Sequence, residues 1–187
     1  MSEETDTDSN AMRVLADWER VLRSRLPLYG HRNWIVVADS AYPAQCSEGI
    51  ETIVAEVDHR VIVEKVLAAI RASGHVKAVI YTDAELMFVD EKDAPGISSR
   101  RNWLSNLDSE VRALPHEEII WKLDRAGKSF RILVIKSNLR IPYTSVFFEM
   151  DCAYWNAEAE MRLRSAMSKG KKTRRSKSRR SPQASRG

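Results

Sequence analysis

Two histidines, an aspartate and a tyrosine have side chains suited to proton transfer to a small polar molecule. His31 follows Gly30 and precedes a short apolar run, and Asp39 stands where that run ends. Because a carboxylate can orient an imidazole, His31 and Asp39 are a candidate acid–base pair held at the two ends of one strand. His116 lies far along the chain, and Tyr143 follows it. The residue types therefore predict acid–base chemistry, with Asp39 as the partner of His31.

The elements that must position these residues alternate between apolar strands and amphipathic helices. We expect helices over 11–26, 59–73, 98–107 and 115–126, and strands over 34–38, 50–57, 76–81, 85–89, 110–114, 130–135 and 145–150. This alternation is typical of the α/β class, so we expect a single layered domain of alternating strands and helices over residues 11–160.

The predicted domain lies between two tails. Residues 1–10 are polar, and we expect a disordered N-terminal tail there. Residues 161–187 form a basic, low-complexity C-terminal tail, which we also expect to be disordered. Of the 30 Lys and Arg residues, 11 lie in 162–187 with no acidic residue, which leaves 19 basic and 26 acidic residues in 1–161. The domain itself is therefore acidic, although the whole chain has a formal net charge of +4.

Composition and motifs exclude several classes of protein. No apolar run approaches the roughly 18–20 residues that span a bilayer, and the acidic, polar N-terminus is unlike a signal peptide. Two cysteines, Cys46 and Cys152, fit a reduced cytoplasmic protein better than a disulfide scaffold. The sequence has no glycine-rich phosphate loop, no metal-ligand spacing and no Gly-x-Ser-x-Gly elbow, so we expect neither cofactor nor metal.

Three blocks of the sequence resemble the D-ribose pyranase and L-fucose mutarotase family. The first runs from Gly30-His31 through an apolar strand to Asp39 and Pro43. The second is His116-Glu117-Glu118 at the start of a helix, and the third is Pro142-Tyr143 before the last apolar strand. The resemblance extends from about residue 12 to about residue 152.

The resemblance implies a cofactor-independent monosaccharide mutarotase or pyranase, which interconverts anomers or ring forms of a free ribose- or fucose-like sugar. It implies a homo-oligomeric ring, of ten copies as one candidate, with the sugar site near subunit contacts. His31 would then be the catalytic acid and base, and Asp39 would hold its imidazole or the sugar. His116, Tyr143 and Ser145 would bind the sugar. The chemistry suits these types, because opening a hemiacetal moves one proton onto the ring oxygen and another off the anomeric hydroxyl.

The chain differs from the family pattern at three positions. Ser145 replaces an asparagine, Asn33 replaces an aspartate of the pyranase-type members, and Ile120 replaces a lysine. These differences motivate a second hypothesis, a protein of the same fold that binds a monosaccharide without turning it over.

The basic tail motivates a third hypothesis, a nucleic-acid-associated protein acting through residues 162–187. Its alternatives are a solubilising extension and a segment that touches an acidic neighbouring subunit. No aromatic residue lies in 162–187, so the base stacking typical of single-strand binders is not expected there.

The remaining histidines, arginines and tryptophans have simpler interpretations. His59 and His75 are expected at the surface, and Arg32 and Arg140 on a solvated face. The five tryptophans are expected in the core or at subunit contacts; they are Trp18, Trp34, Trp103, Trp121 and Trp155.

Overall fold

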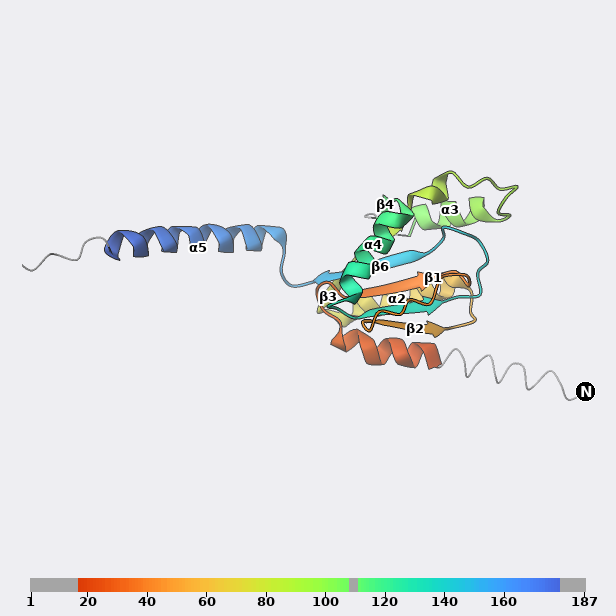
Figure 1. Ribbon diagram of the computed structural model, residues 1–187, viewed down its shortest axis with the longest axis horizontal. Helices are drawn as coiled ribbons and strands as arrows, with labels where there is room; N and C mark the ends of the chain where they lie inside the picture. The colour runs from red at the N-terminus through yellow and green to blue at the C-terminus, as the bar shows by residue number, and fades with distance from the viewer. Residues whose placement is uncertain (1–16, 108–110, 179–187) are drawn as a thin grey trace, which may run out of the picture. The chain divides into compact units, whose positions relative to one another are not determined.

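The computed structural model describes residues 17–107 and 111–178, which fall into two compact units divided after Cys152. The first unit contains a mixed six-stranded sheet and its helices (Figure 1). The expected disordered segment 1–10 lies outside the described residues. None of the helices in the described ranges combines the length and the apolar character of a membrane-spanning segment.

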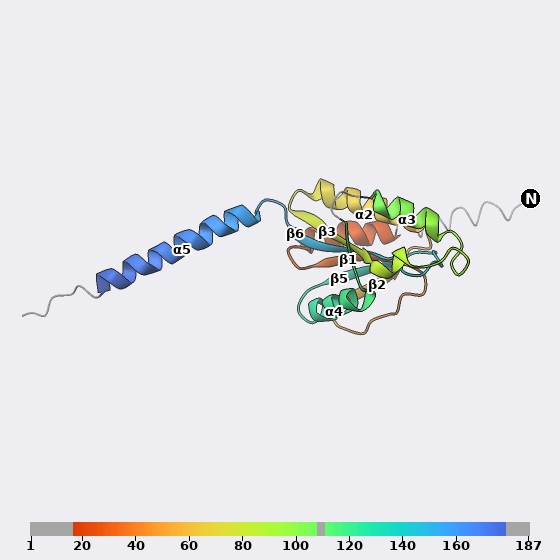
Figure 2. The ribbon, with the colours of Figure 1, turned by 90° about the horizontal axis from the view of Figure 1, so that it is seen from above.

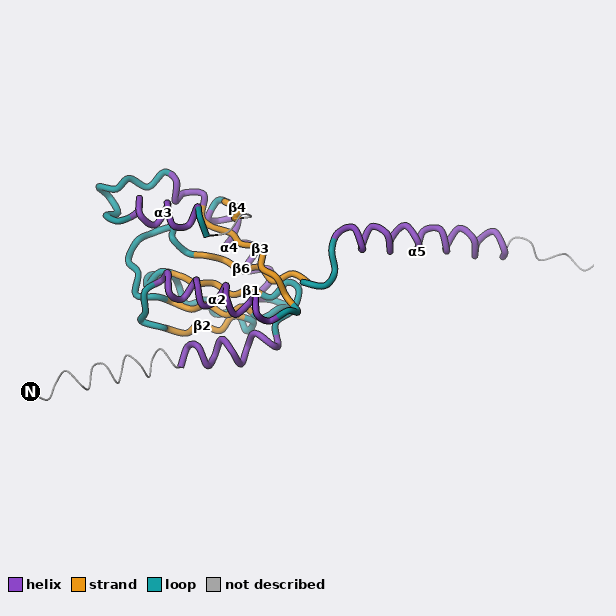
Figure 3. Tube along the Cα trace, turned by 180° about the vertical axis from the view of Figure 1, so that it is seen from behind, coloured by secondary structure: helices purple, strands orange, loops and turns teal. Residues whose placement is uncertain are grey.

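The strands of the sheet are ordered β2-β5-β1-β6-β3-β4 (Figure 3). Their bounds are β1 Trp34–Ala38, β2 Ile50–Val54, β3 Val76–Asp83, β4 Val111–Leu114, β5 Ile132–Lys136 and β6 Val146–Cys152. The strand β6 pairs antiparallel with both β1 and β3, and the other pairs are parallel. Five strands therefore end at the same edge of the sheet, and β6 begins there.

Helices cover both faces of the sheet (Figure 2). Residues 17–25, the short helix η1 (Leu26–Leu28), α2 (His59–Ser73) and α3 (Ile97–Ser105) contribute buried residues to one core, and α4 (His116–Gly127) contributes to the other. Alternate residues of β1 enter the two cores: Ile35 and Val37 face the first, and Trp34 and Val36 the second. Burial on both faces explains why β1 reads as a continuous apolar run.

Local sequence accounts for most helix ends. Asp58 caps α2 through the Arg60 N–H, and Gly74 ends it with a φ of 69°. That left-handed conformation favours glycine. Pro115 precedes the first residue of α4 as its N-cap, one position earlier than the helical position expected for it.

One expected strand and one expected surface residue of the first unit are wrong. Residues 85–89 are not a strand, because β3 continues to Asp83 and the chain then forms the short helix η2 (Ala84–Met87). His59 is fully buried rather than exposed. Its Nε2 lies 3.3 Å from the Val37 carbonyl oxygen, and its ring meets Trp103 edge-on. Burial lowers the pKa of His59 to about 4.

The tryptophans divide between core and surface. Trp18 and Trp34 are buried as expected, whereas Trp121 of α4 is 65% exposed.

The second unit contains α5 (Ala157–Ser178). The expected disordered tail from residue 161 is therefore helical as far as residue 178. Its Arg, Lys, Glu, Met and Ala residues favour helix, and Asn156 caps the first turn by accepting from the Ala159 N–H at 2.8 Å.

Candidate functional site

A cavity of about 540 Å³ lies at the edge of the sheet where β1 and β3 end and β6 begins. Its volume falls in the range of roughly 300–1,000 Å³ that is typical of small-molecule sites. Four of the five residues predicted for the site line it, and they are Asp39, His116, Tyr143 and Ser145. The topology brings them together, because β1, the antiparallel β6 and β3 are adjacent strands.

His116 is held by two carboxylates, one from the end of β3 and one from the short helix η2. Its Nδ1 lies 3.0 Å from Asp83 Oδ1, and its backbone N–H donates to both oxygens of Glu85 at 3.0 Å. No hydrogen bond to His116 Nε2 occurs among the described residues. The pair thus presents one imidazole nitrogen for chemistry while Asp83 fixes the ring.

Asp83 is the residue of the site that sequence reasoning missed. Its side chain is 1% exposed, and Oδ2 finds no hydrogen-bond partner within the described ranges. Burial raises the pKa of Asp83 to about 6, against the lowering effect of the hydrogen bond with His116. The signal was present in the sequence, because Asp83 ends an apolar strand as Asp39 does.

Asp39 and Tyr42 belong to the loop after β1. Asp39 is half-buried, and its Oδ1 accepts from the Ala41 N–H at 2.8 Å. Tyr42 is buried, and burial together with the nearby charges of Asp83, Asp124 and Asp39 raises its pKa. Three carboxylates near one phenol make this part of the cavity acidic.

The loop before β6 supplies Tyr143 and Ser145. Thr144 is fully buried and donates its hydroxyl to the Ile141 carbonyl at 2.7 Å, which closes a turn. Tyr143 sits in that turn with a φ of 56°, a conformation that costs energy for a residue other than glycine. Its ring meets His116 edge-on with centroids 5.8 Å apart. Arg140, expected on a solvated face, is exposed but also lines the cavity.

His31 is not part of this cavity in a single chain. It precedes β1 whereas Asp39 follows it, so a five-residue strand of roughly 16 Å separates them. The His31 imidazole contacts Asp151 instead, with Nδ1 2.9 Å from Oδ1, and its side chain is 60% exposed. The expectation that Asp39 holds the His31 ring is therefore wrong within one chain.

The turn around His31 explains one of the departures from the family pattern. Asn33 accepts from the Gly30 N–H at 2.8 Å and donates to the Arg131 carbonyl at 3.1 Å. An aspartate could accept but not donate here. Asn33 therefore stabilises the turn that presents His31.

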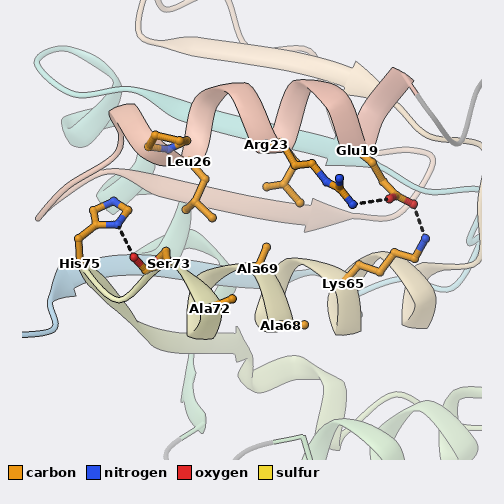
Figure 4. Close-up of a pocket in the computed structure, with 11 residues that line it drawn as sticks. Glu19, Arg23, Leu26, Lys65, Ala68, Ala69, Ala72, Ser73 and His75 are labelled. Atoms are coloured by element: carbon orange, nitrogen blue, oxygen red, sulfur yellow. Dashed lines mark hydrogen bonds and ion pairs between the residues drawn. The ribbon is translucent and has the colours of Figure 1, made fainter.

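A larger cavity, of about 690 Å³, lies between residues 17–25 and α2 (Figure 4). Three alanines of α2 line it, and an ion pair between Glu19 and Lys65 stands at one end. His75 lies at the other end with both ring nitrogens near backbone carbonyls, those of Ser73 and Tyr29. None of the predicted site residues lines this groove.

Comparison with known proteins gives similarity in structure only, because neither a family model nor a curated protein matches the chain. Bacillus subtilis RbsD, solved with D-ribose, is 21% identical with a TM-score of 0.46, covering 70% of this chain and 90% of its own. The fucose mutarotase of Streptococcus pneumoniae, solved with L-fucose, is 17% identical with a TM-score of 0.46, covering 72% and 91%. FucU from Bifidobacterium longum is 14% identical with a TM-score of 0.49, covering 76% and 97%.

These neighbours are the kinds of protein that the three sequence blocks resemble. At identities of 14 to 21% the likeness concerns the path of the chain. The ligand of this chain must therefore be inferred from its own residues.

Proposed function

We propose that the protein interconverts anomers or ring forms of a free monosaccharide, without a cofactor, at the cavity lined by Asp39, His116, Tyr143 and Ser145. The observation that carries the proposal is the His116–Asp83 pair in the wall of that cavity, 3.0 Å apart, with a buried carboxyl group and one imidazole nitrogen without a protein partner among the described residues.

The pair suits hemiacetal chemistry because it can both give and take a proton. When His116 Nδ1–H donates to Asp83, Nε2 carries a lone pair that can accept the proton of the anomeric hydroxyl. The proton for the ring oxygen must come from a second donor on the other side of the ring. A raised pKa of about 6 keeps part of the Asp83 population protonated near neutral pH, so the pair stores a proton.

The remaining polar groups of the cavity suit sugar hydroxyls. Tyr143 and Ser145 each offer a hydroxyl that donates and accepts, and Asp39 accepts only. The Tyr143 ring also offers a flat apolar face to the C–H groups of a sugar.

We propose that His31 of a second copy supplies the other proton donor, in keeping with the family resemblance. His31 is exposed, and Asp151 orients its Nδ1, which leaves Nε2 for an external group. An exposed, oriented imidazole at one edge of the sheet and an incomplete acid–base site at the other are complementary in a head-to-tail assembly.

The charges of the two edges support the same assembly. Asp39, Asp83 and the Glu117-Glu118 pair at the start of α4 make the cavity edge acidic. At the opposite edge, a second cavity of about 410 Å³ is lined by Arg32, Lys122, Arg125 and Glu149. Copies that dock cavity edge to basic edge thus bring unlike charges together, which steers association.

Magnetisation-exchange NMR on ribose, fucose, glucose and galactose tests the activity. We expect faster anomer exchange with at least one sugar, and a loss of about 10²-fold or more in His116→Ala, which removes a general acid–base group. Glu64→Gln, at an exposed position of α2 that does not line the cavity, is the control and should exchange as the wild type does. Equal rates in His116→Ala and wild type would contradict the proposal.

A binding protein without turnover is the second candidate function. Ile120, where the family has a lysine, packs against the core cluster behind α4 rather than lining the cavity, so the charge expected there is missing. A sugar that binds in calorimetry but leaves the exchange rate unchanged would favour this candidate over the first.

A further inference from the structure

The strongest feature that the sugar site leaves unexplained is the basic helix α5. Residues 162–187 hold 11 Lys and Arg and no acidic residue, attached to a segment 1–161 that is net acidic. Eight of these basic residues lie at positions 162–177, within the helix. Most of the basic positions of the tail therefore lie within α5.

The first turns of α5 differ in charge from the rest. Glu160 accepts from Arg164 at 2.6 Å and Glu158 lies 3.8 Å from Arg162, which balances the beginning of the helix. No Asp or Glu follows Glu160 in the sequence. The second half of α5 therefore has basic residues and no acidic residue in its sequence.

The pattern of the helix argues against an apolar partner or a membrane surface. Met167 is the last apolar residue before the end of α5, so its second half has no apolar stripe. Successive basic residues are spaced by one, two or five positions, which distributes charge around a helix of 3.6 residues per turn. Both features suit a polyanion that surrounds the helix rather than a surface that meets one face.

Exposed aromatic side chains lie at the start of the helix. Tyr154 is 79% exposed and Trp155 is 43% exposed. The indole N–H of Trp155 donates to Glu160 at 2.9 Å, which fixes the ring. Exposed aromatic faces are typical of surfaces on which nucleic-acid bases stack.

We propose that α5 binds nucleic acid through its phosphate backbone, independently of sequence, as a second function of this chain. The ligand chemistry is a run of phosphodiesters, which duplex DNA and single strands share. An α-helix with side chains is about 10–12 Å across and fits the major groove of B-form DNA, about 12 Å wide. A single strand would instead use stacking on Tyr154 and Trp155 in addition to the cations.

Binding should also stabilise the helix. Like charges three or four positions apart, such as those at 171, 174 and 175, destabilise an isolated helix by about 0.2–0.5 kcal/mol per pair. Phosphates neutralise this repulsion, so α5 gains helicity when nucleic acid is bound. Circular dichroism of the full chain with and without DNA measures the gain.

The test is fluorescence anisotropy of the full-length protein with a labelled 20-base-pair duplex and a 20-nucleotide single strand. If about six cations contact phosphates, affinity for the duplex falls about 10³-fold between 50 and 200 mM salt. The tail variant replaces six cations by glutamine: Lys169, Lys171, Lys172, Arg174, Arg175 and Lys177. It should lose binding and the salt dependence. The control variant, Lys122→Gln with Arg125→Gln on α4 and Lys128→Gln at its C-cap, should bind as the wild type does.

The measurements on the duplex and on the single strand distinguish binding in the major groove from stacking on aromatic side chains. Tighter binding of the single strand, lost in Tyr154→Ala/Trp155→Ala, supports the stacking mode, and duplex binding that survives this change supports the groove mode. No binding at 50 mM salt, or binding lost only in the α4 variant, would overturn the proposal. So would tighter binding to phosphatidylserine vesicles than to DNA. Anomer exchange is unaffected by the tail variant, so the proposal is independent of the sugar site.

Discussion

The candidate chemistry depends on a pair of residues far apart in sequence, Asp83 and His116. Asp83 is buried at the end of β3, with one oxygen near His116 Nδ1 and the other without a partner among the described residues. A buried carboxyl group is destabilising when ionised unless it is paired. The fold thus holds a carboxyl group with a raised pKa beside the imidazole of His116. Carboxyl groups with perturbed pKa values are often found at functional sites.

Replacement of Asp83 by asparagine should lower the rate of anomer exchange and raise the free energy of unfolding. The carboxylate that fixes the His116 tautomer is lost, so we expect anomer exchange to fall by about 10²-fold. The pKa of about 6 in the folded state exceeds the ordinary aspartate value of 3.8, so the folded state binds more protons between these values, and stability falls as pH rises through them. Asp83→Asn should therefore be more stable than wild type above pH 6, on the order of 1–3 kcal/mol. Urea unfolding at pH 7 measures this, and a variant that is both inactive and less stable would assign Asp83 a structural role.

Titration of His59 should change the stability of the fold in the opposite direction to titration of Asp83, over nearly the same range of pH. Its pKa of about 4 in the folded state lies below the ordinary histidine value of 6.5, so the unfolded state binds more protons between pH 4 and 6.5. Stability should then be lost as pH falls through this range, by on the order of 1–3 kcal/mol. In Asp83→Asn, urea unfolding from pH 7 to 4 should show a steeper loss than in wild type, because His59 is no longer opposed. His59→Gln should flatten the curve, and an unchanged curve would contradict the assignment.

At the scale of elements, the directions of the strands decide what the cavity contains. β1 and β3 both run toward the cavity edge, and β6 runs away from it between them. This arrangement gathers two strand ends, one strand start and the beginning of α4 at one place. The same directions place His31, which precedes β1, at the opposite edge.

The packing of α4 against β2 depends on a close approach of backbone at Gly49. A Cβ at Gly49 would lie 2.2 Å from the Gly127 carbonyl oxygen and 2.4 Å from that of Phe130, which are backbone atoms that cannot rotate away. We expect Gly49→Ala to destabilise the protein by about 1–3 kcal/mol, as overpacking does. Gly30→Ala is the matched control, since a Cβ added at Gly30 would have no neighbour within 4 Å. Similar thermal midpoints for the two variants would show that α4 moves without cost.

At the scale of the whole molecule, the acidic cavity edge and the basic edge favour association between copies. In the proposed assembly, His31 of one copy would reach His116, Asp39 and Tyr143 of another.

Mixing two inactive variants tests the shared site. We expect His31→Ala and His116→Ala each to be inactive, because each lacks one proton-transfer group. Coexpressed in equal amounts, they should form intact sites at roughly one quarter of the positions in a randomly mixed head-to-tail ring. NMR exchange of the mixture should therefore recover about 25% of the wild-type rate. No recovery, with mixed oligomers confirmed by mass spectrometry, would contradict a site that combines His31 of one copy with His116 of another.

The sequence by itself predicted most of the local elements and four of the residues that line the cavity. Apolar runs and helical spacing predicted β1 and α2 within their observed bounds, because burial on both faces and an amphipathic pattern leave direct traces in the order of residues. Gly74 marked the end of α2 for a reason that is local to the backbone. Residues at strand ends and helix starts, such as Asp39 and His116, could be identified because those positions gather at sheet edges.

Only the tertiary structure decided which side chains meet. Asp83 pairs with His116 and not His31 with Asp39, because strand direction and helix packing bring together residues that are 33 positions apart and separate residues that are 8 positions apart. Burial of His59 likewise depends on Trp103 and Val37, which belong to other elements. Pairing and burial are properties of the packed chain, and no local pattern of residues specifies them.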